Sequence, residues 1–93
     1  MSSLDAALLR SFVAVARTGS VSGAALRVGR TQSAVSMQMQ RLEAAIGQPI
    51  LHRTGAGVGL TATGERLLSH AEKILAAHDE AMADLSGAGL QGA

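Results

Sequence analysis

Residues 30–43, RTQSAVSMQMQRLE, decide how the chain folds. Thr31 is a good N-cap residue, so a helix is predicted to begin directly after it. The buried face of this helix consists of apolar residues at helical spacing: Val35, Met39, Leu42 and Ile46. Gly47 ends the pattern and Pro49 prevents its extension, so the helix is predicted to cover residues 32–46.

The opposite face of this helix is small and uncharged. At about 100° per residue it presents Ser33, Ser36, Met37, Gln40 and Ala44. A helix face that is merely solvated normally carries lysine and glutamate at several such positions. Glutamine pairs bidentately with adenine, serine bonds base edges or phosphates, and the free N–H groups of a helix N-terminus bind phosphate. The pattern favours a recognition helix in the major groove of duplex DNA over a solvated surface helix.

Two further helices are predicted before this one. The first runs from about residue 4 to Thr18, and Gly19 suits its C-terminal cap. Ser20 suits the N-cap of a second, short helix that ends near Gly29. The second helix, a glycine-containing turn and the recognition helix together predict a helix-turn-helix motif.

The second half of the chain predicts a hairpin and a long helix. Residues 50–61 are too short and glycine-rich for a helix and favour a small β-hairpin. From Ala62 a helix of about 24 residues, about 36 Å long, is predicted. Its apolar stripe consists of Leu67, Ala71, Ile74, His78, Met82 and Leu85. A small domain cannot cover such a helix alone, so a homodimer through this stripe and an inverted-repeat DNA site are expected.

Charge is distributed unevenly along the chain, although its net charge is only +1. Residues 6–53 hold six arginines and one acid, Glu43, whereas residues 65–84 hold five acids and two basic residues. Arginine binds phosphate bidentately and is weakly hydrated, so the first segment suits a nucleic-acid surface. An ordinary solvated face is the alternative interpretation of the charge alone. Glu43 is expected to be a structural acid that bonds the neighbouring helix.

Several classes of function find no support in the composition. The chain has no cysteine, its three histidines are not at i, i+3 or i, i+4 spacing, and no catalytic or phosphate-loop motif occurs. We therefore expect neither an enzyme nor a metal site or cofactor. Phe12 is the only aromatic residue, which disfavours single-strand or RNA binding by base stacking. No apolar run is long enough to span a bilayer, so a cytoplasmic protein without membrane contact is expected.

Short motifs along residues 4–86 match one known family in order and spacing: Leu9-Arg10-Ser11-Phe12-Val13-Ala14-Val15-Ala16, Gly19-Ser20, Ala24-Ala25, Thr31-Gln32-Ser33-Ala34-Val35-Ser36, Arg41-Leu42-Glu43, Gly47, Arg53, Leu60-Thr61 and Gly64. The sequence thereby resembles the N-terminal winged helix-turn-helix domain of the LysR-type transcriptional regulators. Within residues 30–43 it looks most like the branch that contains the motility and virulence repressors HexA and LrhA.

The resemblance implies a mainly α fold, with a three-helix core and a short β-hairpin wing, followed by a long linker and dimerisation helix. Residues 1–61 would form the DNA-binding domain, 62–86 the linker helix, and 87–93 a flexible tail toward an effector domain that this chain does not contain. The chain would then be a fragment of a bacterial, nucleoid-associated regulator that binds DNA as a homodimer, with a tetramer possible for the full-length protein.

On matching positions, Gln32, Ser33 and Ser36 take the family's base- and phosphate-contacting roles and Arg53 a role at the wing. Three positions depart from the family pattern. Met37 replaces a common arginine, which favours an apolar contact, for instance to a thymine methyl group. Ala56 replaces a basic residue at the wing tip, and Arg30 replaces an apolar turn residue and can contact a phosphate. The predicted DNA contacts are Arg30, Thr31, Gln32, Ser33, Ser36, Met37, Gln40, Arg41 and Arg53.

A second hypothesis assigns the chain to a different class. The acidic last helix and the missing basic wing tip are also compatible with a winged-helix module for dimerisation or protein interaction that does not recognise specific DNA. Binding to duplex DNA that weakens steeply with salt distinguishes the two, because only phosphate contacts give that dependence.

Overall fold

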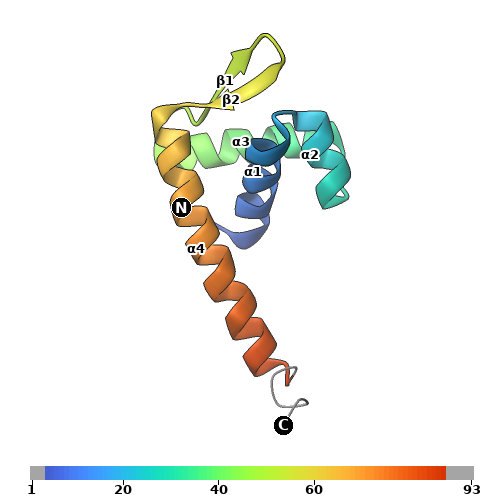
Figure 1. The fold of residues 1–93 in the computed structure, drawn as a ribbon, viewed down its shortest axis with the longest axis vertical. Coiled ribbons are helices and arrows are strands. Elements are labelled where there is room, and N and C mark those ends of the chain that lie inside the picture. The colour runs from blue at the N-terminus through green and yellow to red at the C-terminus, as the bar shows by residue number, and fades with distance from the viewer. Residues whose placement is uncertain (1–3, 88–93) are drawn as a thin grey trace.

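Four helices and one two-stranded hairpin make up residues 4–87 of the chain (Figure 1). The computed structural model describes residues 4–87 of the 93. Its elements, in order, are α1 (Ala6–Thr18), α2 (Val21–Val28), α3 (Gln32–Ile46), β1 (Leu51–Thr54), β2 (Gly57–Leu60) and α4 (Ala62–Leu85). The prediction of a mainly α winged helix-turn-helix followed by a long helix is confirmed. Within the described residues, no helix is both long and apolar enough to cross a membrane.

The helix boundaries follow from capping side chains. Ser20, Thr31 and Thr61 each accept a hydrogen bond from a backbone N–H in the first turn of the helix that follows. The first helix begins at Ala6 rather than near residue 4, because the carboxylate of Asp5 accepts hydrogen bonds from the first-turn backbone and caps it there. The first three helices end at glycines in the left-handed conformation: Gly19, Gly29 and Gly47.

α1 lies at the centre of the fold and packs against α2, α3, α4 and β2. The core is almost entirely aliphatic, as the composition predicts, with Phe12 as its single aromatic side chain. Its fully buried large side chains are Leu9, Phe12, Val15, Val35, Leu42 and Ile50. Core side chains of α1 and α3 pack in one cluster. The position of α1 therefore fixes the orientation of α3, the predicted recognition helix.

One buried polar contact also connects α1 to α3. The Ser11 hydroxyl donates a hydrogen bond of 2.5 Å to the side-chain oxygen of Gln38, and both residues are buried. Within residues 4–87, no buried side-chain polar atom lacks a partner. Since an unsatisfied buried amide is destabilising, this bond selects one rotation of α3 about its axis.

The hairpin is fixed to the helices through its backbone. β1 and β2 pair antiparallel, with Leu51 opposite Leu60, and the turn between the strands contains Ala56. The backbone N–H of Val58 donates to the carbonyl of Gly19, 3.0 Å away, at the turn between α1 and α2. A Cβ atom on Gly57 would collide with that same carbonyl, so only glycine permits this approach. The wing therefore has a defined position beside the helix-turn-helix.

The first half of α4, beyond the division predicted at residue 61, packs against the helix-turn-helix body. Leu67 and Ala71 are only 6% and 0% exposed and belong to the core of the helix-turn-helix body. Beyond Leu75, which packs partly against this core, all residues of α4 are exposed and the helix projects away from the body (Figure 1). The body thus includes the first half of α4. Of the predicted tail 87–93, residues 88–93 lie outside the described part of the chain.

Removing the Ser11 hydroxyl tests the link between α1 and α3. We expect Ser11→Ala to lower the free energy of unfolding by about 1–3 kcal/mol, because the Gln38 side-chain oxygen is then buried without a donor. Urea denaturation followed by circular dichroism measures this change. The double variant Ser11→Ala/Gln38→Met, which removes both polar partners, should recover part of the loss. A single variant as stable as the unmodified protein would contradict the assignment.

Candidate nucleic-acid interface

A hollow of about 430 Å³ lies between α3, the hairpin and the N-terminus of α2; we call it the α3–hairpin groove. Its polar lining comprises Ser20, Ser22, Gln32, Ser36, Gln40, Glu43, His52 and Arg53. Four of the predicted DNA contacts, Gln32, Ser36, Gln40 and Arg53, thus lie around one hollow although Arg53 is distant from the others in sequence. Amides, hydroxyls and one guanidinium are groups that bind base edges and phosphates.

Ser20 and Ser22 line the α3–hairpin groove and were not among the predicted contacts. The Ser20 hydroxyl caps α2, and the two hydroxyl oxygens are 3.0 Å apart. Only the packing of α2 beside α3 brings them to the groove, so no sequence spacing indicates it. His52 also lines the groove, from the wing where the sequence predicts it.

A second hollow, of about 260 Å³, lies on the other side of α3 and we call it the α1–α3 hollow. Arg30, Met37 and Arg41 line it, together with Asp5, whose carboxylate caps α1. The predicted contacts are therefore divided between two flanks of one helix. Two further predicted contacts line neither hollow: Ser33 is exposed on the outer face of α3, and the hydroxyl oxygen of Thr31 accepts the Ala34 N–H as the helix cap.

The basic segment is partly neutralised within the chain, which corrects the interpretation of its six arginines as one surface. Arg10 Nη2 lies 2.6 Å from Asp79 Oδ1, and Arg17 Nη2 lies 2.9 Å from Glu72 Oε2. Both pairs connect α1 to α4 and are exposed to solvent. The other four arginines have no carboxylate oxygen within 4 Å in residues 4–87: Arg27, Arg30, Arg41 and Arg53. Three of these four line the two flanks of α3.

The pairing shifts the ionisation of both partners. The hydrogen bond from Arg10, and then its positive charge, hold the pKa of Asp79 below the ordinary value for aspartate, and the same contacts raise the pKa of Arg10. His78 joins this cluster, because its Nδ1 lies 3.4 Å from Arg10 Nη2 and 3.6 Å from Asp79 Oδ1. The ring of His78, which is predicted to lie on a helix-pairing seam, thus contacts the Arg10 side chain of α1 in the same chain.

Glu43 has a structural role, but its partner differs from the predicted one. Its carboxylate accepts a hydrogen bond of 2.9 Å from the backbone N–H of Ile50, in the segment that leads into β1, rather than from a neighbouring helix. This bond holds the start of the hairpin against α3. It also occupies the one carboxylate that lines the α3–hairpin groove among the residues that the structure describes.

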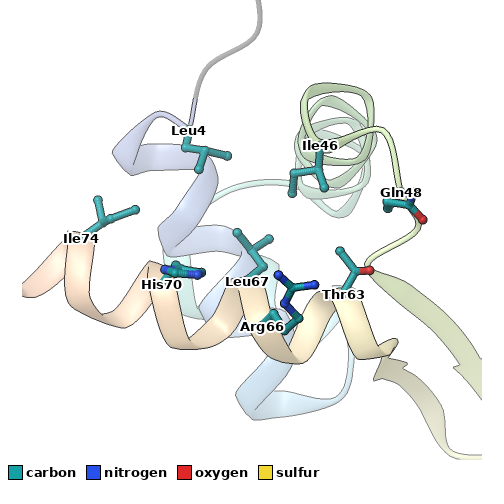
Figure 2. A pocket seen from close by; sticks show the side chains of 8 residues that line it. All are labelled: Leu4, Ile46, Gln48, Thr63, Arg66, Leu67, His70 and Ile74. Atoms are coloured by element: carbon teal, nitrogen blue, oxygen red, sulfur yellow. The ribbon is translucent and has the colours of Figure 1, made fainter.

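A third hollow, of about 520 Å³, is lined by residues of α3, α4 and the segment before α1 (Figure 2). Figure 2 shows Leu4, Ile46, Leu67 and Ile74 around it, with Arg66 and His70 on α4. We call it the α4 hollow. The exposed apolar residues of the projecting half of α4 continue from it: Ile74, Met82 and Leu85. Since Leu67 and Ala71 belong to the core, only this part of the predicted dimer stripe is free for a partner.

No cluster of three or more potential metal ligands occurs in residues 4–87.

Comparison with known proteins yields one family. Residues 6–65 match the model of the bacterial regulatory helix-turn-helix proteins of the lysR family. The regulator DgdR of Burkholderia cepacia is 62% identical over 90 residues, covering 97% of this chain and 31% of that protein. The regulator PecT of Dickeya dadantii is 51% identical over 89 residues, covering 96% and 28%. The chain spans less than a third of the length of these curated relatives, and the narrower HexA and LrhA branch stays a prediction.

A solved structure of the CbnR DNA-binding domain in complex with DNA has the same fold. It superimposes with a TM-score of 0.83 at 34% sequence identity, and the match covers 92% of this chain and 99% of that one. A similarity of this extent includes the hairpin and α4 as well as the three core helices.

The ion pair between α1 and α4 predicts a shifted titration. In carboxyl-carbon NMR spectra recorded against pH, Asp79 should titrate below the ordinary aspartate pKa, and Arg10→Ala should return it toward that value. Because the folded-state pKa is lowered, the pair stabilises the fold at neutral pH and this contribution is lost as the pH falls through the Asp79 pKa. Both groups are exposed, so the loss should be small. An Asp79 titration unchanged in Arg10→Ala would contradict the pairing.

Proposed function

Since the chain belongs to the lysR family of bacterial regulatory helix-turn-helix proteins, we propose that it binds duplex DNA sequence-specifically as the DNA-binding part of a transcription regulator. The observation that carries this proposal is the α3–hairpin groove, where three uncharged polar side chains of α3 and Arg53 of the wing surround one hollow. α3 enters the major groove, and the hairpin lies along the adjacent backbone.

The side chains divide into two roles. Gln32, Ser36 and Gln40 contact base edges, because amides and hydroxyls both donate and accept hydrogen bonds in the patterns that distinguish base pairs. Arg53 binds the phosphate backbone on the hairpin side of α3, where it has no carboxylate partner within the described residues. Arg30 and Arg41 do the same on the α1 side, and Ser33 and Thr31 contribute at the N-terminus of the helix.

The alternative, an interaction module without DNA specificity, rests on the acidity of α4 and on the missing basic residue at the wing tip, and the first of these grounds is weakened by the structure. Two of the five acids on that helix, Glu72 and Asp79, pair with arginines of α1. Their negative charge is therefore used within the chain and requires no basic partner protein.

We place the protein among non-enzymatic regulators of the bacterial cytoplasm and nucleoid, where a genomic DNA target is present. No cofactor is required for this role.

Base and phosphate contacts predict different losses of affinity. Gln32→Ala should weaken binding to a specific site by about 1–3 kcal/mol and leave binding to random duplex DNA almost unchanged, because base contacts determine specificity. Arg53→Ala should weaken binding to every duplex and reduce the slope of log affinity against log salt by about one unit. Fluorescence anisotropy over a series of salt concentrations measures both effects.

Arg10→Ala is the matched control for the arginine variant. Arg10 carries the same charge, but its guanidinium is bonded to Asp79, so the salt slope should stay as in the unmodified protein. The proposal fails if duplex DNA is not bound even at low salt, or if Gln32→Ala reduces specific and random binding equally.

We propose further that α4 pairs antiparallel with the α4 of a second copy. Ile74 is 39% exposed beside the α4 hollow, and Met82 and Leu85 are exposed farther along the helix. At about 100° per residue, Arg66 and Asp84 lie on the same side of this apolar stripe. Antiparallel pairing brings the end of one helix to the hollow of the other, so apolar groups are covered and opposite charges meet.

A buried charge on this stripe should separate the copies. We expect Ile74→Asp to give monomers at micromolar concentration in sedimentation experiments, because the carboxylate would lie in the apolar contact. Affinity for an inverted repeat should fall by about 100-fold or more, and affinity for a single half-site should change little. Ala76→Asp places the same charge on the opposite, exposed face of α4 and should remain dimeric. A monomeric unmodified chain that binds both kinds of site equally would contradict the dimer.

A further inference from the structure

Met37 is a large apolar side chain that α3 leaves exposed. It is 56% exposed, whereas Met39 on the same helix is buried in the core. At about 100° per residue, Met37 lies about 60° from Gln40 and about 40° from Ser33, so it borders the face proposed to contact base edges on the side of the α1–α3 hollow. Packing within residues 4–87 does not account for this residue, since more than half of its surface is exposed.

Two unpaired arginines flank Met37. Arg30, Met37 and Arg41 line the α1–α3 hollow together, and neither guanidinium has a carboxylate oxygen within 4 Å in the described residues. If both bind phosphates, they hold this flank of α3 close to one DNA strand. The neighbours of Met37 on the preceding turn of α3, Ser33 and Ala34, have short side chains, so the thioether of Met37 extends farther from the helix than they do. Met37 must then lie against the base edges of the major groove.

The chemistry of the major groove restricts what Met37 can contact there. The base edges present hydrogen-bond donors and acceptors, and the methyl group of thymine is the one apolar group among them. A thioether is at most a weak acceptor, so against any other base it would desolvate polar groups without bonding them. We propose that Met37 packs against the C5 methyl group of a thymine and so selects that base. This inference rests on the proposed function, because it requires α3 to lie in the major groove.

Deoxyuridine, which is thymine without the methyl group, tests the contact directly. A specific duplex is first selected by the unmodified protein from a library with randomised sequence. Each thymine of that duplex is then replaced in turn by deoxyuridine, and affinity is measured by anisotropy. We expect one thymine in each half-site at which the replacement weakens binding about fourfold, the effect of exposing one buried methyl group.

Variants of Met37 assign that loss to this side chain. In Met37→Ala the deoxyuridine duplex should bind as well as the thymine duplex, whereas Leu26→Ala, which truncates an exposed apolar side chain on α2, should keep the full discrimination. Met37→Arg should replace the preference for thymine with one for guanine at the same position, because arginine pairs bidentately with guanine. Since Met37 is exposed, neither substitution disturbs the core.

The outcomes separate this inference from the proposed function. If the unmodified protein selects no duplex at low salt, the proposed function itself is wrong. If it selects a specific duplex but no thymine is sensitive to loss of its methyl group, the contact with Met37 does not exist. Sensitivity that persists unchanged in Met37→Ala would equally overturn the inference, because another residue would then contact the methyl group.

Discussion

The backbone contact between Gly57 and Gly19 sets the distance between the hairpin and the helix-turn-helix. The Gly19 carbonyl accepts a hydrogen bond from Val58 and lies where a side chain on residue 57 would have to be. This approach determines the width of the α3–hairpin groove, because α3 is fixed independently by the core and by the bond from Ser11 to Gln38. The groove is thus formed by two elements whose backbones are held against the same helix-turn-helix body before any ligand binds.

Charge pairing concentrates the remaining positive charge where DNA is proposed to bind. The two arginines of α1 are neutralised by acids of α4 in solvent-exposed pairs between the long helix and the body. Of the six arginines in residues 6–53, those left without a carboxylate partner in the described part of the chain lie mainly on the two flanks of α3. A net charge of +1 therefore conceals a local distribution that suits phosphate binding, and the acidic half of α4 points away from it.

Local patterns in the sequence predict the helices well, because helix ends depend on capping residues close in sequence. Ser20, Thr31 and Gly47 were sufficient to define the ends of α2 and α3. Contacts between distant segments could not be predicted in the same way. The sequence does not show that Leu67 is needed by the core, that Arg10 pairs with Asp79, or that two hollows divide the predicted contacts, because each depends on how helices pack in three dimensions.

The central claim is that α3 and the hairpin contact duplex DNA together. Amide chemical shifts of the ¹⁵N-labelled chain, recorded while a selected duplex is added, test it most directly. The account predicts large shift changes at Gln32, Ser36 and Arg53, and small changes in the projecting half of α4. Shift changes confined to α4, or absent from the hairpin while α3 responds, would contradict it.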